Sequence, residues 1–277
     1  MPLVAALFVP NAPFLISPSA FGGVGEEAAR DLQNLKLRER FRPEGILVAS
    51  PHWSAPGRFR IQAAPVPRQI YDFSGFPREL YSVRYAPPGD PPLARLLEEA
   101  GTREGIPVET TQDWGLDHGV WAPLIRLWPE GDLPTLPLSI SDRSPEDHVK
   151  WGAVLGEALR HEPRRLVMVG TGSITHSFSR MDPTPGARWT QGESIEREIV
   201  DLALRGQTKE LTHFDRAKWE TVEPEGNLGP LFMVLGALRE NWEGRLVSTS
   251  QVYGAFGMSI LEFSEGTSAP TEAGPRP

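Results

Sequence analysis

Three of the six histidines in this 277-residue chain stand beside turns that interrupt apolar runs. His52 follows a run that begins at Gly45, and His176 follows one that begins at Leu166 and ends in a turn with two glycines. His118 comes directly before the apolar pattern of a helix. Imidazole binds metals and exchanges protons near neutral pH. The three residues therefore predict a metal or acid–base site, provided that the fold brings them together.

Two asparagines occupy similar places. Asn11 follows a predicted first strand over residues 3–9, and Asn227 precedes the last predicted helix. Ligands of open α/β sheets bind beyond the carboxyl ends of the strands, so these amides and the three histidines can meet at one rim. Each histidine alone could be a structural residue, but three in glycine- or proline-shaped loops exceed what core packing requires.

Strand and helix patterns alternate along the chain, which predicts an α/β fold. We expect one domain over residues 1–263, with a central, mostly parallel or mixed sheet flanked by helices and with active-site loops at the carboxyl ends of the strands. Pro51 should end its strand because it has no amide hydrogen, and residues 264–277 are predicted to be a disordered tail. The expected strands cover residues 3–9, 45–50, 59–63, 108–111, 136–140, 166–169, 246–251 and 258–263, and the main helices 25–40, 91–104, 120–127, 193–204, 209–220 and 228–239.

The loop over residues 71–90 mixes aromatic residues, Gly and Pro without a helix or strand period. Loops of this length inside a domain are either functional or packed against the surface. The other three histidines, His148, His161 and His213, fall in helix patterns rich in charged residues, and we expect them to be solvated.

Composition excludes several classes of partner and site. The net charge of -8 argues against nucleic acid or an anionic membrane as a partner, and no apolar run reaches the roughly 20 residues of a membrane helix. The N-terminus has no basic region before its apolar run, so we expect a cytoplasmic protein. Because the chain has no cysteine, any metal must be held by His, carboxylate or amide groups.

Several common enzyme motifs are also missing. The sequence has no Gly-x-Ser-x-Gly elbow, no P-loop and no His-x-x-x-His pair, which removes the usual hydrolase, nucleotide-binding and zinc-protease interpretations. The turn at Gly170–Gly172 lacks the third glycine of a dinucleotide-binding fingerprint.

The chain resembles the class III extradiol ring-cleavage dioxygenases, the superfamily of the protocatechuate 4,5-dioxygenase catalytic subunit, and within it the 4,5-DOPA-type branch. The matching segments run in the family's order and cover nearly the whole chain up to the tail. They are Ser50–Trp53, Tyr71–Pro77, Tyr85–Asp90, Gly115–Leu124, Gly170–His176 and Tyr253–Met258.

The resemblance implies a non-haem Fe(II) site, with Zn as the metal in some members. In the family two histidines and a third ligand hold the ion, and the third is Glu in the protocatechuate branch and His in the DOPA branch. A face of three ligands leaves positions open for both catechol oxygens and for O2. The second ligand falls on His52, the first on Asn11 and the third on Asn227.

The resemblance also implies the proton chemistry. The family's acid–base histidine falls on His176, which would take a proton from the catechol and later return one to oxygen. The histidine that contacts substrate or bound oxygen falls on His118. The implied partners are a catechol or related phenol and O2, with a homo-oligomer or a homologous subunit as the expected assembly.

Two departures keep a second interpretation open. Asn11 and Asn227 replace strong ligands with neutral amides, which are weak donors to Fe(II), and Glu223 or Glu225 could supply a carboxylate instead. The main hypothesis is an iron-dependent extradiol dioxygenase with an altered metal site. The alternative is a metal-free, non-catalytic member that supports an active subunit or binds a small molecule.

Overall fold

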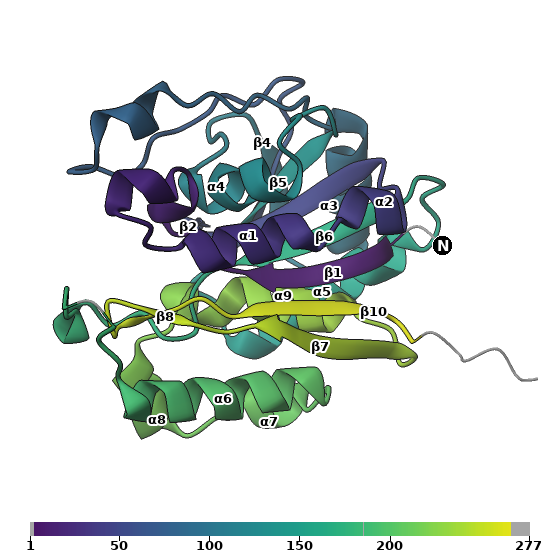
Figure 1. Cartoon of the computed structure of the whole chain (residues 1–277). Coiled ribbons are helices and arrows are strands. Elements are labelled where there is room, and N and C mark those ends of the chain that lie inside the picture. The colour runs from purple at the N-terminus through teal and green to yellow at the C-terminus, as the bar shows by residue number, and fades with distance from the viewer. Residues whose placement is uncertain (1–2, 185, 267–277) are drawn as a thin grey trace, which may run out of the picture.

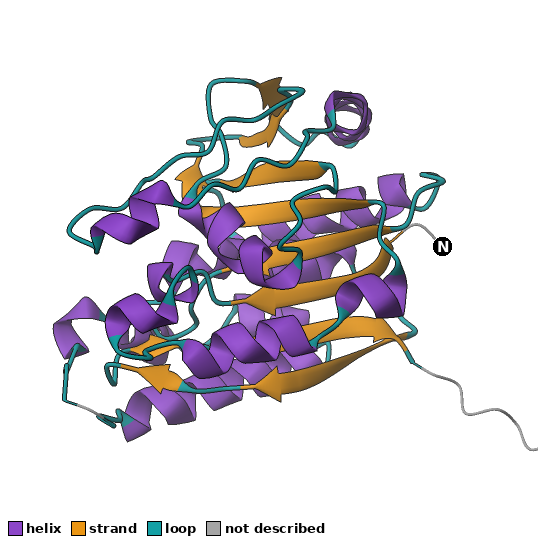
Figure 2. Ribbon diagram, turned by 45° about the horizontal axis from the view of Figure 1, so that its top comes forward, coloured by secondary structure: helices purple, strands orange, loops and turns teal. Residues whose placement is uncertain are grey.

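Eight strands form one mixed sheet, with the order β4-β3-β5-β2-β6-β1-β10-β7 across it. The computed structural model describes residues 3–184 and 186–266. The central strands β1, β6, β2 and β5 run parallel, whereas β10 and β7 add an antiparallel edge beside β1 (Figure 2). The strands are β1 Leu3–Val9, β2 Gly45–Ser54, β3 Phe59–Gln62, β4 Val108–Thr111, β5 Thr135–Ile140, β6 Leu166–Thr171, β7 Trp242–Ser248 and β10 Ile260–Glu265, with a separate hairpin of β8 Gln251–Val252 and β9 Phe256–Gly257.

Helices cover both faces of the sheet (Figure 1). The α-helices are α1 Glu26–Asn34, α2 Leu37–Phe41, α3 Pro91–Arg103, α4 His118–Leu127, α5 Pro145–Leu159, α6 Thr190–Leu204, α7 Thr208–Thr212, α8 Arg216–Val222 and α9 Gly229–Ala237. Short 3-10 helices lie at η1 Pro13–Leu15, η2 Pro18–Phe21, η3 Arg78–Ser82, η4 Phe178–Arg180 and η5 Glu225–Leu228.

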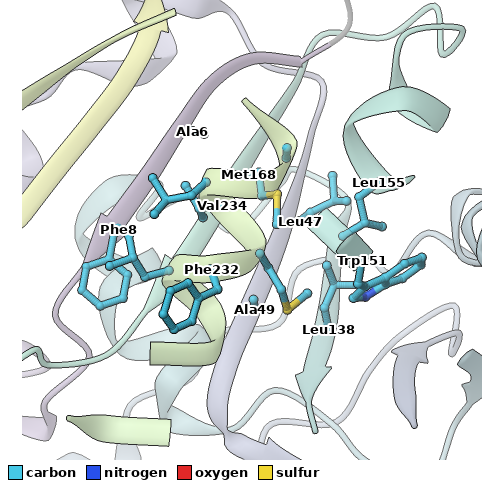
Figure 3. Packing of buried hydrophobic residues seen from close by; sticks show 14 of the residues in the cluster. Ala6, Phe8, Leu47, Ala49, Leu138, Trp151, Leu155, Met168, Phe232 and Val234 are labelled. Atoms are coloured by element: carbon cyan, nitrogen blue, oxygen red, sulfur yellow. The ribbon is translucent and has the colours of Figure 1, made fainter. Parts of the chain in front are cut away.

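Alternate residues of the central strands enter two separate cores. Leu47 and Ala49 of β2 pack on the side of α3, α5 and α9, whereas Ile46 and Val48 pack on the side of α1 and α4. Figure 3 shows the first core, in which Trp151 of α5 lies beside Leu47 and its neighbours. A parallel sheet buried on both faces needs such continuous apolar runs, and these runs are what made the strands predictable from sequence.

Glycines let α5 and α9 pack at short range. A Cβ added at Gly152 of α5 would overlap the carbonyl oxygen of Met233 in α9, and one at Gly236 of α9 would overlap the carbonyl oxygen of Val149 in α5. Because the helix backbones meet directly, α9 is fixed on the sheet, and with it the segment that precedes α9.

The α/β prediction with a mixed sheet and flanking helices is confirmed, but some boundaries were wrong. The helix expected over 25–40 breaks at Lys36, which has a φ of 47°, and the one expected over 209–220 divides into α7 and α8. Ser264 and Glu265 of the predicted tail continue β10, and residues 267–277 lie outside the described part. Across the described residues, no helix is both long and apolar enough to cross a membrane.

His148 is not solvated, contrary to our expectation. Its ring is buried, with Nδ1 2.9 Å from the Ser144 carbonyl oxygen and Nε2 accepting from the Ser141 amide at 3.2 Å. Burial lowers the pKa of this imidazole. The side chains of His161 and His213 are 85% and 68% exposed, as expected. His148 is thus a structural residue that ties the start of α5 to the end of β5.

The contact between α5 and α9 gives a stability prediction. Gly152→Ala should lower the free energy of unfolding by about 2–3 kcal/mol, because the added methyl group must separate two helix backbones. Glu157→Ala, on the exposed side of α5, should change it by less than about 1 kcal/mol. Urea denaturation of both variants measures the difference, and equal midpoints would contradict the close-contact argument.

Candidate metal and active site

Asn11, His52 and His176 meet at one end of the sheet, because they follow or end β1, β2 and β6, which are neighbouring parallel strands. His118 at the start of α4 joins them, as does Glu225 from the segment before α9. The five side chains line one cavity of about 390 Å³. The structure therefore brings together four of the five site residues predicted from sequence.

A bulge in β2 aims His52 at this cavity. We predicted that this strand would end at Pro51, but it continues to Ser54. Its pairing with β5 shifts register between Ser50 and Ser54. A bulge redirects the side chains of a strand, and Pro51 fits here because it has no amide to pair. The Ser50 hydroxyl lies 3.2 Å from the His52 amide, which donates to it and fixes the turn.

Glu225 lies against His52 at the base of the cavity. Its Oε1 is 2.9 Å from Nε2 of His52 and 3.3 Å from the side-chain nitrogen of Asn11, while its Oε2 accepts from the Ser173 amide at 3.0 Å. Nε2 of His52 is buried, but its contact with Glu225 misses hydrogen-bond geometry. None of the described residues therefore forms a hydrogen bond with this nitrogen. The two atoms approach closely without sharing a well-aligned proton.

This arrangement suits a bound cation. Two ligand atoms, each about 2.1 Å from one ion and at right angles, are about 3 Å apart, close to the His52–Glu225 distance of 2.9 Å. A 180° rotation of the Asn11 side-chain amide would exchange its nitrogen and oxygen and turn the oxygen toward the same point. Asn11, His52 and Glu225 could therefore hold an ion with three side chains.

The charges of the His52–Glu225 pair stabilise each other. Burial raises the pKa of the Glu225 carboxyl, but His52 outweighs it and lowers the pKa to about 2. Burial likewise lowers the pKa of His52, but the carboxylates of Glu225, Asp117 and Asp72 together more than offset it, so the net pKa is raised. A metal ion bound here would replace a proton on His52, because only the neutral imidazole is a ligand.

Asn227 lies outside the cavity, which contradicts its predicted role as a metal ligand. It is exposed, and its side-chain oxygen is 3.4 Å from Nε1 of Trp219. Gly226, Asn227 and Leu228 all have φ between 51° and 55°, a left-handed turn that asparagine tolerates and that glycine adopts freely. Asn227 thus shapes the turn, and Glu225, two residues earlier, faces His52.

His118 is held by Asp72 from the long loop. The Asp72 Oδ1 accepts from the His118 amide at 2.8 Å, and Oδ2 lies 2.9 Å from Nδ1 of the ring. Although this part of the loop is exposed, the Asp72 side chain is only 16% exposed. Burial raises the pKa of Asp72, but His118 lowers it by more. As at His52, this ring contact misses hydrogen-bond geometry. An anionic oxygen beside Nδ1 still favours the tautomer with its hydrogen there, which leaves Nε2 as the acceptor nitrogen.

The buried carboxylate of Asp117 connects the strand that carries His52 to the helix that begins with His118. Asp117 caps α4, since its side chain accepts from the Val120 amide, and it also accepts from the Ser50 hydroxyl at 2.6 Å and from Trp114 Nε1 at 2.8 Å. The rings of His52 and His118 have centroids 3.9 Å apart. Asp117 therefore fixes the bulge of β2 to the start of α4.

His176 stands on the opposite side, between Phe178 and Phe256, with ring centroids 5.0 and 5.3 Å away. Its amide donates to the Val222 carbonyl at 2.8 Å, which holds the loop in place. Among the described residues none hydrogen-bonds to its ring nitrogens, so the ring is available to a molecule in the cavity.

A second group of ligand atoms adjoins the first. His52, Asp72 and His118 bring one such atom each to within 4.8 Å of one another. Asp72 already uses both oxygens on His118, however, and its distance to Nδ1 of His52 is 3.7 Å. A carboxylate placed in this way orients an imidazole, so the Asn11–His52–Glu225 set fits an ion better.

Comparisons with known proteins identify the family of the chain. The family model described as "Catalytic LigB subunit of aromatic ring-opening dioxygenase" matches residues 27–263. The chain belongs to this family. Its members are non-haem metal enzymes. The matched range contains His52, His118, His176 and Glu225, whereas Asn11 precedes it.

Relatives and a solved structure extend the match. The chain is 39% identical over 223 residues to "4,5-DOPA dioxygenase extradiol" of Escherichia coli K12, covering 77% of this chain and 78% of that protein. It is 29% identical to the protein of the same name from Beta vulgaris, and the match covers 80% of this chain and 84% of that protein. The crystal structure of an uncharacterized Escherichia coli K12 protein shares the fold, with a TM-score of 0.72 at 24% identity over 94% and 99%.

The family gives the chain a function of the extradiol ring-cleavage dioxygenase type, and the metal-free, non-catalytic alternative is not favoured. Sequence reasoning left the choice between Glu223 and Glu225 open and gave Asp72 no role. The dipeptide Gly226-Asn227 does indicate a turn, but a turn does not distinguish Glu223 from Glu225. No comparable sequence signal identified Asp72.

Asp72→Asn tests whether this carboxylate sets the tautomer of His118. Asparagine still accepts from the His118 amide but offers an N–H group to Nδ1, which reverses the tautomer. We expect kcat/KM for a catechol to fall about 10- to 100-fold, with an altered pH profile and an unchanged melting temperature. Asp113→Asn, at an exposed position in the connection between β4 and α4, is the control. A normal pH profile for Asp72→Asn would contradict the tautomer argument.

Proposed function

We propose that the protein is an Fe(II)-dependent extradiol dioxygenase that opens a catechol-type ring with O2, and that Asn11, His52 and Glu225 hold the ion. The observation that carries this proposal is the contact between His52 and Glu225 at the base of a ring-lined cavity. When bound, a ferrous ion supplies the electronic path between the ring and O2. Zn is the alternative ion, which would fill the site without supporting this redox step.

The histidines then divide the proton chemistry. His176 faces the cavity with free ring nitrogens, so it can take a proton from a substrate hydroxyl and hold it until the ring opens. His118, oriented by Asp72, offers Nε2 to a second oxygen of the substrate or of O2. The aromatic walls keep bulk water away, which strengthens these polar contacts.

Compartment and assembly belong to the same proposal. A cytoplasmic protein would meet the reducing conditions that keep iron ferrous. The description of the matching family as a catalytic subunit supports assembly, either of identical chains or with a homologous subunit.

The direct test uses the whole chain, reconstituted anaerobically with Fe(II). We expect about one bound iron per chain. O2 and catechol should be consumed in equal amounts, and the same amount of ring-opened product should form. Zn-loaded protein should bind the catechol without consuming O2. Iron binding without any O2 consumption across a panel of catechols would contradict the proposed reaction.

Glu225→Gln tests the carboxylate ligand. The amide keeps the shape but not the charge, and an amide is a weaker ligand for Fe(II), so affinity should fall about 100-fold or more. Glu223→Gln is the matched control, because Glu223 is exposed and its carboxylate accepts from Ser177. Chelator competition measures both affinities, and equal losses would place the third ligand elsewhere.

Asn11→His tests the weakest member of the set. Imidazole is a stronger ligand for Fe(II) than an amide, so the affinity should rise about 10-fold or more. Asn11→Ala should weaken binding at the same position. If both variants bind iron as the unchanged protein does, Asn11 is not a ligand.

A further inference from the structure

The cavity wall beyond the polar residues is a continuous arc of aromatic rings. Tyr253 contacts Phe14 with a centroid distance of 6.3 Å, Phe14 contacts Phe21 at 6.0 Å, Phe21 contacts Phe76 at 5.8 Å, and Phe76 contacts Phe73 at 5.5 Å. All four pairs are edge-to-face, the arrangement that ring quadrupoles prefer. These rings come from three separate connections of the chain, so the wall is held by mutual packing.

The mouth of the cavity is apolar as well. Phe178 and Met181 line it, although they are 67% and 51% exposed. They are two of the five exposed large hydrophobic residues in the described part of the chain. Exposed apolar side chains that gather at one opening indicate a surface that a ligand covers.

No Arg or Lys among the described residues lines this cavity. Three arginines near the cavity have partners elsewhere. Arg180 stacks over the Trp189 ring, Arg126 of α4 donates to the carbonyl oxygens of Leu15 and Ile16, and Arg84 lies over the Tyr71 ring. A carboxylate on the substrate would therefore find no cationic partner in the wall.

The charged side chains nearest to the cavity are carboxylates, and each lies beside an imidazole. Glu225 lines it and Asp72 lies behind His118. Beside the aromatic rings a substituent carboxylate would lose its water without gaining a cationic partner. An alkyl or aryl substituent would instead bury its surface against the rings.

We propose that this site selects catechols with an uncharged, apolar ring substituent and discriminates against carboxylated catechols. The inference rests on the proposed function for the identity of the ring and adds the substituent class. A cavity of about 390 Å³ lies within the range of sites that hold ligands of drug-like size, so it has room for a substituent beyond the catechol ring.

The test compares 4-propylcatechol, 3-(3,4-dihydroxyphenyl)propanoate and catechol, the first two having side chains of equal length. Anaerobic calorimetry on the Fe(II)-loaded protein measures binding without turnover, and O2 uptake measures kcat/KM. Each buried methylene strengthens binding by about fourfold. We expect 4-propylcatechol to bind at least 10-fold more tightly than catechol, and at least 10-fold more tightly than the propanoate.

Two variants test whether the residues at the mouth of the cavity cause the preference for an apolar substituent. Phe178→Ser should reduce the advantage of 4-propylcatechol over catechol by about threefold to tenfold. Met181→Arg should tighten binding of the propanoate about 10-fold. The controls are Val66→Ser and Leu246→Arg, at exposed apolar residues outside this cavity, and neither should change the ratios.

The outcomes separate the two proposals. Preferential binding of 4-propylcatechol without O2 uptake would support the substituent class and refute the dioxygenase reaction. Turnover with the propanoate preferred would support the reaction and overturn the substituent class. Equal affinities for all three compounds, or no binding of any of them, would also overturn it.

Discussion

The close contact between Glu225 and His52 is the interaction on which the site depends. A buried carboxylate is unstable unless charge and hydrogen bonds compensate its lost hydration. Glu225 has both: the imidazole of His52, the amide of Asn11 and the backbone amide of Ser173. These partners come from the ends of β2, β1 and β6, so one side chain holds three strand ends together.

Two irregular backbone features support that contact, and the packing of the regular elements around them offsets their unfavourable conformations. The bulge of β2 turns His52 inward, and the left-handed turn at Gly226–Leu228 turns Glu225 to meet it. A left-handed conformation at Asn227 and Leu228 is unfavourable by about 1 kcal/mol or more per residue. It persists because α9 is fixed against α5 immediately after the turn, through backbone contacts that only glycine permits.

These features explain what the sequence could and could not predict. The buried runs of β1, β2 and β6 were readable because both faces of the sheet are apolar, and parallel strands bring their carboxyl ends together by topology. The predicted convergence of Asn11, His52 and His176 follows from that rule. Glu225 could not be chosen over Asn227 in the same way, because a left-handed turn displaces side chains in a manner that helix and strand periods do not encode.

The same limit applies to the loop over residues 71–90. Its sequence shows aromatic residues without a period, which fits either a functional loop or surface packing. In the structure the two descriptions coincide: Phe73 and Phe76 pack into the ring arc, while Asp72 between Tyr71 and Phe73 reaches His118. The packing that orders the loop is therefore what positions its carboxylate. The apolar wall and the orientation of the histidine depend on the same packing, since Phe73 also contacts the His118 ring. Changes in substituent preference at Phe73 or Phe76 will therefore be coupled to the orientation of His118.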